Sequence, residues 1–335
     1  MHVAVIHNIK QTGVINRFGK QNKEMYFRDE IDAVIDALKS KNHVVKEFDG
    51  DKFLIQNLES FLPEIKSGVK PEGIALNLAY GIQGNSRYTH VPSILEMAGV
   101  PYTGSPPLGH SVALDKEMTK RILLQSGIPT PRFILLDRKI NRDDANHIKL
   151  SYPLIIKPEN EAASFGIAVF DDPEKFSDTV NATLDEFQQP ILVEEFLNGR
   201  EFNVGVLGNG SAMEVFDPVE IDFCRSGDCF QSYDGKKRGR YQHICPPGIT
   251  DTLKNELKGI ASKTFEVLKC NDYARIDFRL DQDMNPYVLE LNSMAAIHRK
   301  GSFFHAARNA GYDYADMMDK MIEVATKRYS NTMEI

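Results

Sequence analysis

Two neighbouring segments in the last quarter of the chain alternate polar and apolar positions with a period of two, which is typical of strands with one buried face. They are residues 274–280 (ARIDFRL) and 287–292 (YVLELN), and the DQDMNP between them is typical of a turn. The pattern predicts an antiparallel hairpin in which Leu280 pairs with Tyr287. Its apolar face, expected to pack against the core, comprises Ile276, Phe278, Leu289 and Leu291.

The other face of this hairpin carries polar side chains. The same pairing places Asp277 opposite Glu290 and Arg275 opposite Asn292. Two carboxylates and an amide offer the oxygen ligands that Mg²⁺ prefers, and Mg²⁺ commonly completes its shell with water and substrate phosphates. The face therefore predicts a magnesium site beside a bound nucleotide. The alternative is an ordinary solvated face, on which an arginine beside two acids is common.

The first hundred residues alternate strand-like and helix-like patterns, which predicts an α/β domain with a mainly parallel sheet. Apolar residues at helical spacing predict helices near 31–38 and at 91–98, and Gly99 is expected to end the second one. Short apolar runs predict strands at 3–6, 44–48 and 74–78.

Changes in composition predict two domain boundaries. A loop rich in glycine and proline, residues 102–109, separates the first α/β pattern from the next helix. A second boundary is expected near Leu192, before a strand-rich module with two late helices. The expected domains are 1–108, a parallel α/β domain; 109–191, a central module; and 192–335, a C-terminal module with the metal site.

Composition and charge narrow the class of protein. The chain has 335 residues, 42% of them hydrophobic, which suffices for two or three modest cores. Its formal charge of −7 argues against nucleic acid or an anionic membrane surface as the main partner. There is no apolar run long enough for a signal peptide or a membrane span, so a cytoplasmic location is expected. The four cysteines are irregularly spaced, which favours reduced thiols over disulfides or a zinc site.

Two lysines are candidates for phosphate binding. Residues 153–158 (PLIIKP) predict an apolar strand that ends beside Lys157, and a loop of small residues, 159–166 (ENEAASFG), follows it. Such a lysine can contact a phosphate while the loop acts as a lid. The loop does not fit GxxxxGK[ST], and no GxGxxG follows the first strand. Lys116, on a predicted helix, offers a second cation; either lysine could instead be a surface side chain.

Taken together and in this order, the segments resemble the ATP-grasp superfamily and, within it, the D-alanine–D-alanine ligase family. The resemblance runs from about residue 74 to 325 and implies a three-part α/β fold, with ATP held between the central and C-terminal modules. It also implies ADP-forming ligation of a carboxylate to an amine through an acyl phosphate. The matching segments are VPSILEMAGVPYTGS with DKEMTK, YPLIIKP with AASFG, ILVEEFLNGREFNV, and ARIDFRL with YVLELNS.

The resemblance also implies roles for single residues. Asp277, Glu290 and Asn292 would hold one or two Mg²⁺ ions, with Mn²⁺ as an alternative, and Arg275 would stabilise charge on the acyl phosphate. Two loops, 162–166 and 231–240, would act as lids that exclude water. The residues expected to bind ATP are Lys116, Lys157, Ser164, Gly166, Glu194 (adenine amino group), Phe196 and Leu197 (hinge), Glu201 (ribose), and Lys236 or Lys237; Ser164 and these last two lysines are also candidates for catalysis.

The chain departs from the family pattern where the substrate is expected. HNIKQTG replaces the glycine-rich amino-terminal segment, and only Glu24 stands roughly in place of its glutamate. Ala163 replaces a serine, Arg87 and its neighbours replace an acidic run, and a Pro-Gly after the metal-binding asparagine is lost. The residues expected to contact the substrate are Glu24, Arg87, Tyr88, His298, Arg299 and Ser302.

These departures predict a more anionic substrate and poor synthesis of D-alanyl-D-alanine, unless the added cations are merely surface residues. The expected partners are a small carboxylate and a small amine, with no nucleic acid or membrane, in a chain that could form a homodimer. Four alternatives stay open: a ligase that loads an acid onto a carrier protein or thiol, a D-alanine–D-alanine ligase proper, a simple kinase, and a nucleotide-binding module without chemistry.

Overall fold

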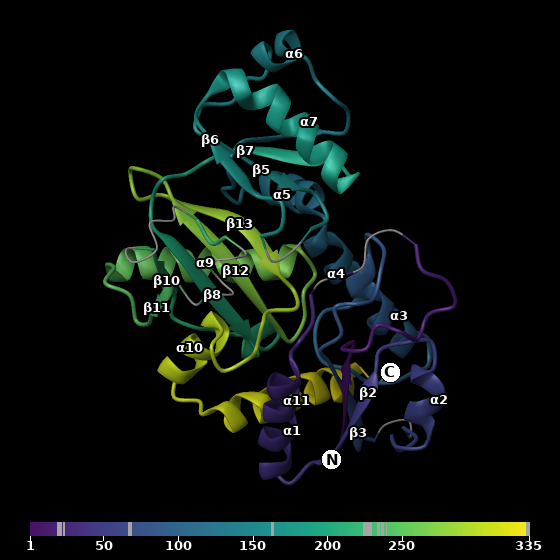
Figure 1. The fold of residues 1–335 in the computed structure, drawn as a ribbon. Helices are drawn as coiled ribbons and strands as arrows, with labels where there is room; N and C mark the ends of the chain where they lie inside the picture. The colour runs from purple at the N-terminus through teal and green to yellow at the C-terminus, as the bar shows by residue number, and fades with distance from the viewer. Residues whose placement is uncertain are drawn as a thin grey trace.

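In the described part of the chain, three β-sheets flanked by helices make up the computed structural model (Figure 1). This mixed α/β architecture agrees with the expected fold class. None of the described helices is long and apolar enough to cross a membrane. The residues that the structure describes are 1–18, 22, 24–65, 69–161, 164–223, 230–232, 235, 238 and 240–332.

The N-terminal sheet is parallel, as the alternating pattern predicts. Strand β1 (His2–His7) lies between β2 (Val44–Asp49) and β3 (Gly73–Asn77) and pairs with both. All six residues from His2 to His7 have partners on β2, and β1 is buried apart from its first residue. A central parallel strand of this kind is covered on both sides, which explains its continuous apolar run.

Helices cover both faces of this sheet. α1 (Arg28–Ser40) and the last helix, α11 (Tyr314–Thr332), share a core with one face, while α2 (Leu54–Glu59) and α3 (His90–Met97) cover the other. Figure 1 shows α11 beside α1, although the two lie at opposite ends of the chain. The chain therefore returns to its first domain after building the other two.

Two helices lead from the first sheet to the second. α4 (Pro107–Leu114) begins at the predicted boundary loop, and α5 (Lys116–Gln125) follows after a single residue. That residue, Asp115, caps α5, because its carboxylate accepts a hydrogen bond of 2.8 Å from the backbone nitrogen of Met118. The cap fixes the start of α5 and thereby the position of Lys116 in its first turn.

The central sheet is antiparallel, with strand order β4-β7-β5-β6. The boundary expected at Leu192 falls inside its strand β7, so we propose that the central module extends to Glu195. The bounds are β4 (Phe133–Leu136), β5 (Leu154–Pro158), β6 (Ala168–Phe170) and β7 (Ile191–Glu195).

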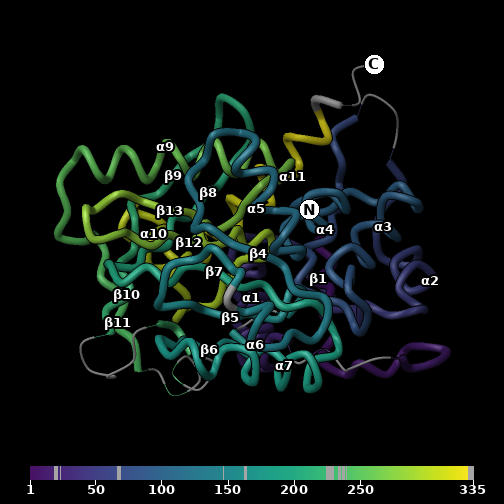
Figure 2. Tube along the Cα trace, turned by 90° about the horizontal axis from the view of Figure 1, so that it is seen from above, coloured from purple at the N-terminus to yellow at the C-terminus, as the bar shows by residue number. Residues whose placement is uncertain are grey.

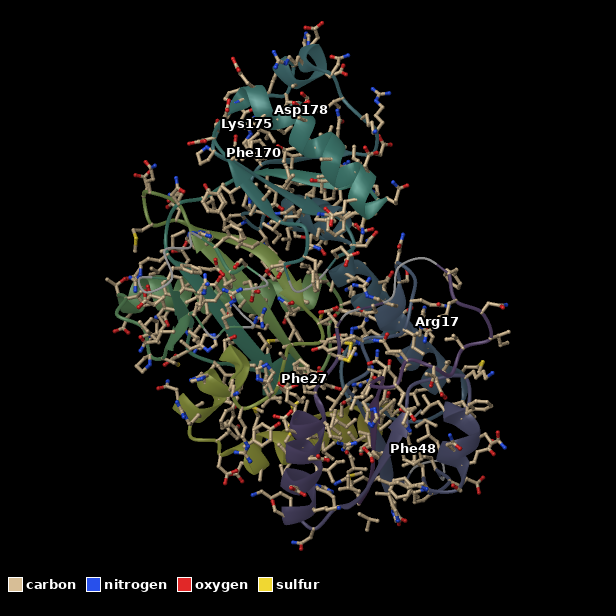
Figure 3. The ribbon with its side chains drawn as sticks, viewed as in Figure 1. Arg17, Phe27, Phe48, Phe170, Lys175 and Asp178 are labelled. Carbon is tan, nitrogen blue, oxygen red and sulfur yellow. The ribbon has the colours of Figure 1, made fainter. Side chains whose placement is uncertain are left out.

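Two helices, α6 (Arg142–Asn146) and α7 (Phe176–Phe187), cover the outer face of the central sheet. Phe170 on β6 packs under α7, with 5.5 Å between its ring centroid and that of Phe176. Lys175 and Asp178, at the start of α7, are exposed (Figure 3). The inner face of this sheet is thus the one left to border a ligand.

The C-terminal sheet has the order β11-β10-β8-β12-β13, and β9 also pairs with β8. Helix α9 (Asp251–Val267) packs with α5 against one face, and α10 (Ser302–Asn309) lies against the other. Figure 2 shows this module opposite the N-terminal layers. The bounds are β8 (Glu201–Leu207), β9 (Glu214–Val215), β10 (Val219–Asp222), β11 (Gln242–Ile244), β12 (Tyr273–Leu280) and β13 (Pro286–Asn292).

The predicted hairpin is confirmed as β12 and β13, with one correction. Asp277 pairs with Glu290 as expected, but Leu280 pairs with Pro286 and not with Tyr287. The difference is a β-bulge, in which Leu289 is the extra residue between two pairs. Leu289, expected in the core, therefore turns toward a cavity on the polar face, and Val288 takes its place in the core.

Candidate active site between the two clasping sheets

A cavity lies between the central and C-terminal sheets. It contains about 760 Å³ of empty volume, part of it open to solvent. Strands β5, β7, β12 and β13 contribute its walls, and residues 195–197 join the two sheets at one end. Of the residues expected to bind ATP or metal, the cavity is lined by Lys116, Lys157, Ser164, Glu194, Phe196, Leu197, Glu201, Asp277 and Glu290.

Glu194, only 1% exposed, is held between two lysines at the wall of this cavity. Its Oε2 lies 2.9 Å from Nζ of Lys157, and its Oε1 lies 3.2 Å from Nζ of Lys120. Burial alone raises the pKa of the Glu194 carboxyl, but the two lysines outweigh it and hold this pKa below its usual value. The carboxylate is therefore charged; its Oε2 accepts a hydrogen bond from Lys157, whereas its Oε1 has Lys120 as an ionic neighbour and no hydrogen-bond partner among the described residues.

Lys120 is a site residue that the sequence did not single out. It is 1% exposed, donates a hydrogen bond of 2.7 Å to Thr130, and burial lowers its pKa to about 8, with Glu194 acting in the opposite direction. Thr130 in turn donates to the backbone oxygen of Val288, at 2.8 Å. Its position four residues after Lys116, on the same face of α5, was the available signal.

The ribose-binding candidate Glu201 is oriented by two neighbours. Nη1 of Arg279 lies 3.2 Å from Glu201 Oε2, and Nε2 of Gln231 donates to Oε1 at 2.5 Å. Arg279 is opposite Glu201 in the strand register, and its guanidinium stacks 4.7 Å from the ring centroid of Phe196. Arg279 was not predicted as a site residue, because its alternation with Asp277 also fits an ordinary polar face.

The metal candidates converge as the hairpin pattern predicts. Nδ2 of Asn292 donates to Asp277 at 3.0 Å and lies 3.5 Å from Glu290. Asn203 on β8, which the sequence did not indicate, donates to the same aspartate at 2.8 Å. Both oxygens of Asp277 accept hydrogen bonds, Oδ1 from Asn203 and Arg275 and Oδ2 from Asn292 and Arg275. The carboxylates of Asp277 and Glu290 and the amide oxygen of Asn292 are ligand types that Mg²⁺ prefers.

Lys116 lies at the phosphate end of the cavity and contacts the start of the small-residue loop. Its Nζ donates to the backbone oxygen of Glu159 at 3.1 Å and also to that of Glu161. Burial lowers the pKa of Lys116, and the charge of Glu290 opposes this effect. A bound phosphate would offer Lys116 charged partners in place of these carbonyls.

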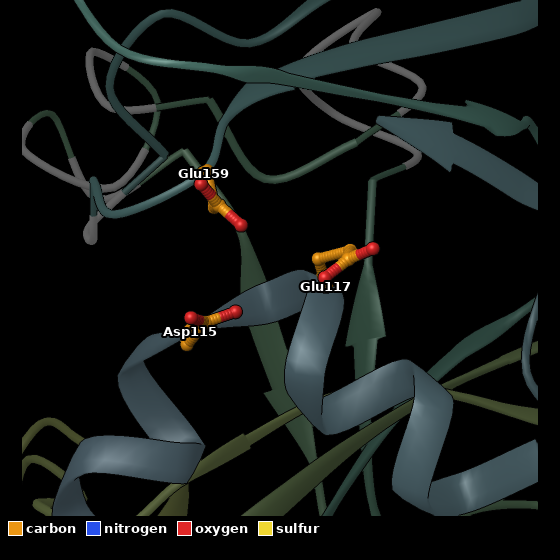
Figure 4. A group of neighbouring side chains, drawn as sticks. All are labelled: Asp115, Glu117 and Glu159. Carbon is orange, nitrogen blue, oxygen red and sulfur yellow. The ribbon is translucent and has the colours of Figure 1, made fainter. Parts of the chain in front are cut away.

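An acidic group lies next to Lys116, on the outer side of the same loop. Ligand atoms of Asp115, Glu117 and Glu159 lie within 4.8 Å of one another (Figure 4). Burial, followed by the charges of Asp115 and Glu117, raises the pKa of Glu159 to about 7. This cluster differs from the predicted metal site, and exposed acidic groups often occur without an ion.

The small-residue loop ends with residues that have a left-handed backbone conformation. Ser164 has φ of 64° and Gly166 has φ of 72°. A Cβ on Gly166 would lie 2.6 Å from the ring of Phe187 and 2.6 Å from Pro158, so only glycine fits there without displacement. Ala163, Lys236 and Lys237 lie outside the described residues.

Comparisons with known proteins identify the family. The profile described as "D-ala D-ala ligase C-terminus" matches residues 122–323. A D-alanine–D-alanine ligase of Carboxydothermus hydrogenoformans is 32% identical over 300 residues, which is 87% of this chain and 90% of the relative. The chain belongs to the D-alanine–D-alanine ligase family. It is therefore an ATP-grasp ligase, an enzyme that forms carbon–nitrogen bonds.

Other proteins are similar along nearly the whole chain. A protein of Sinorhizobium fredii, described as uncharacterised, is 38% identical over 335 residues, 98% of each chain. A D-alanine–D-alanine ligase from Bacillus anthracis in complex with ATP has a TM-score of 0.76 at 22% identity, covering 99% of each chain. The ligase from Coxiella burnetii has a TM-score of 0.72 at 18% identity, covering 100% of this chain and 96% of that structure. These two structures support the expected fold.

On the substrate side, the structure of this family member brings Glu24, Tyr88 and Arg87 together. The Tyr88 hydroxyl donates to Glu24 Oε2 at 2.5 Å, and Nη2 of Arg87 lies 3.7 Å from the same oxygen. Burial raises the pKa of Glu24, although Tyr88, Arg87 and Lys116 oppose it. The charges of Lys116 and Glu290, which line the cavity, act on Glu24, although Glu24, Arg87 and Tyr88 are not among the described residues that line it.

Of the remaining substrate candidates, His298 and Arg299 lie on the loop after β13, and Ser302 begins α10. His298 is near Arg275, whose charge contributes to lowering the pKa of His298, after the larger effect of burial. Arg299 is exposed and stacks 4.1 Å from the ring centroid of Tyr314, so it is not part of the buried cluster. Ser302 is 4% exposed at the first turn of α10. His243 on β11, not indicated by the sequence, also lies near Arg275 and His298; mainly because of burial, its pKa is lowered to about 4.

Proposed function

We propose that this chain joins a small carboxylate to an amine in an ATP-dependent reaction that passes through an acyl phosphate and releases ADP and phosphate. The observation that carries this proposal is the joint placement of Lys116 and Lys157 with Asp277 and Glu290 around one cavity. Cations and hard oxygen donors around one cavity fit a triphosphate with its magnesium ions.

Within this cavity the chain's residues have separable tasks. The hinge at Phe196 and Leu197 would receive the adenine, and Glu201 would accept hydrogen bonds from the ribose hydroxyls. Lys157 and Lys116 would bind phosphate oxygens as point charges. Glu194 would position Lys157, which donates a hydrogen bond to its Oε2, and its Oε1, which has no hydrogen-bond partner among the described residues, would accept from the adenine amino group.

The metal candidates would act on the charge of the transferred group. When bound by Asp277, Glu290 and Asn292, Mg²⁺ neutralises negative charge on the phosphates and orients them. Arg275 lies beside this set and would stabilise the charge that develops on the acyl phosphate and on the tetrahedral intermediate. Positioning and charge neutralisation then suffice, with no covalent bond to the enzyme.

In this proposal, the carboxylate and amine substrates are not two molecules of D-alanine. Arg87 is 93% removed from solvent and stands beside Glu24, which changes the charge of the site that would receive the first substrate. We expect little D-alanyl-D-alanine from D-alanine and Mg-ATP. A rate comparable with that of a cell-wall ligase would contradict this expectation and support the alternative, a D-alanine–D-alanine ligase proper.

The reaction type has a direct test. Carboxylate and amine pairs are incubated with Mg-ATP, and ADP with phosphate is measured against AMP with pyrophosphate. We expect ADP release that requires the carboxylate substrate. When hydroxylamine serves as the amine, we also expect a hydroxamate. Pyrophosphate release would refute the acyl-phosphate route, and mass spectrometry distinguishes a free amide from an adduct on a carrier protein or thiol.

A further inference from the structure

Arg87 and Glu24 carry opposite charges and lie side by side in a largely buried position, but no hydrogen bond joins them. The exposed fractions of the two side chains are 8% and 16%, and the shortest distance between them, from Nη2 to Oε2, is 3.7 Å. This exceeds a hydrogen bond, whereas closely paired arginine and carboxylate groups usually form two bonds. Glu24 uses the same oxygen for Tyr88.

Arg87 has hydrogen-bonding capacity left over in this buried position. Nη1 donates to the backbone oxygen of Asn160 at 3.0 Å, but the buried Nε has no hydrogen-bond partner among the described residues. An unpaired buried donor of this kind is costly, and a ligand that accepts its hydrogen bond removes the cost. The guanidinium therefore has the properties of an anion-binding group.

The pair is located where the first substrate would lie. Asn160 belongs to the segment that Lys116 contacts through the carbonyls of Glu159 and Glu161. The charges of Lys116 and Glu290 both act on Glu24. A molecule held by Arg87 and Glu24 is thus next to the phosphate and metal end, and not at the adenine end.

Building on the proposed function, we infer that Glu24 and Arg87 bind the α-ammonium and α-carboxylate of an amino acid whose second, side-chain carboxylate is the group that reacts. A cation and an anion side by side match a zwitterion. The inference assigns one carboxylate to Arg87 and a second, reacting carboxylate to Arg275 and the metal candidates, because these are two separate cationic positions on different elements of the fold. The substrate class is an amino-dicarboxylic acid.

The chemistry is the same as for any carboxylate in this cavity. A side-chain carboxylate oxygen attacks the γ-phosphorus of ATP, the bond to the β–γ bridging oxygen breaks, and ADP leaves. The amine nitrogen then attacks the acyl carbon, phosphate leaves with the electrons of the carbon–oxygen bond, and the nitrogen loses a proton to water. The α-carboxylate and α-ammonium are unchanged throughout.

The test uses the full chain with Mg-ATP and hydroxylamine and compares the D and L forms of aspartate, glutamate and alanine. We expect ADP release and a side-chain hydroxamate, located by tandem mass spectrometry, from at least one aspartate or glutamate, at a kcat/KM at least 100-fold above that for alanine. Turnover of alanine at comparable efficiency would overturn the inference and leave the proposed ligase intact. No ADP release with any of the six acids would count against both.

Two variants test the role of Arg87 itself. Arg87→Met should raise KM for the amino-dicarboxylic acid at least 30-fold and leave KM for ATP within twofold. Arg87→Lys keeps the positive charge and should give an intermediate KM for the acid; it also serves as the test variant if Arg87→Met fails to fold. Arg28→Met, an arginine of the same domain in exposed ion pairs, is the matched control and should match the unaltered chain. An unchanged KM for the acid in both Arg87 variants would exclude the assignment.

Discussion

Arg275 holds Asp277 through two hydrogen bonds of 2.7 Å, from Nε to Oδ1 and from Nη2 to Oδ2. Both residues lie on β12, two positions apart, and Asp277 faces Glu290 across the hairpin. The arginine therefore orients a metal candidate and also places a fixed positive charge at the end of the cavity where acyl transfer is proposed. This arrangement leads to the first two predictions.

Replacing Arg275 by methionine should lower kcat about 10²–10³-fold, the usual loss when a preorganised group that stabilises transition-state charge is removed. Because Arg275 is distant from the hinge in sequence and position, KM for ATP should change little. Steady-state kinetics with saturating substrates measures both constants. Lys139→Met, at an exposed ion pair, is the control, and a selective rise in KM for ATP would contradict the role.

Glu290→Gln should abolish turnover while the folded state is retained. The carboxylate lines the cavity and lies opposite Asp277, so the amide removes one of two negative ligands for Mg²⁺. Titration of MgCl₂ at fixed ATP should show a weaker apparent Mg²⁺ affinity, and thermal melting should stay within a few degrees of the unaltered chain. Retained activity at ordinary Mg²⁺ concentration would remove Glu290 from the metal site.

Lys120→Met should destabilise the fold by about 3 kcal/mol, because it leaves the buried Glu194 with Lys157 as its single ionic partner. Urea unfolding measures this change in the free energy of unfolding. Lys139→Met, whose ion pair with Asp185 is exposed, should change it by less than about 0.5 kcal/mol. Equal effects of the two substitutions would show that the Lys120–Glu194 contact contributes no more than a surface pair.

Glu159 should make stability fall as pH rises from about 4.5 to 7. Its pKa in the folded protein is raised to about 7, so between the unfolded and folded values the folded state binds more protons than the unfolded one. The stabilisation from Glu159 is fully present at low pH and is lost as pH passes 7. Over this range the loss lowers the free energy of unfolding by no more than about 1.4 kcal/mol per pH unit. Urea unfolding of Glu159→Gln in EDTA should lack this slope, whereas the exposed control Glu59→Gln should keep it. Identical pH profiles for Glu159→Gln and the unaltered chain would refute the assignment.

Arg279→Met should raise KM for ATP about tenfold, since the loss of a hydrogen bond to a charged group costs about 1.5–3 kcal/mol. Without Arg279, Glu201 loses one of the partners that orient it, and we expect weaker recognition of the ribose hydroxyls. The ratio of kcat/KM for ATP to that for 2′-deoxy-ATP should therefore decrease in the variant. A purely structural role would lower both values equally and leave this ratio unchanged.

Local patterns predicted much of the hairpin but not its exact register. Alternation identified two strands, and Asp277 and Glu290 are paired as expected. The pairing of Leu280 with Tyr287 was wrong because a bulge adds Leu289, and the alternation of apolar residues does not reveal which residue is extra. The consequence is local but relevant, since it moves Leu289 from the core to the cavity wall.

The sequence by itself determined the parallel N-terminal sheet and the two strands of the hairpin, because each depends on short-range periodicity. Only the tertiary structure decided which distant charges meet. Glu194 is held by Lys120 and Lys157, and Arg87 lies beside Glu24, through contacts between elements that fold together from separate parts of the chain. Burial gives these contacts their strength, and burial is a property of the packed domains and not of any one segment.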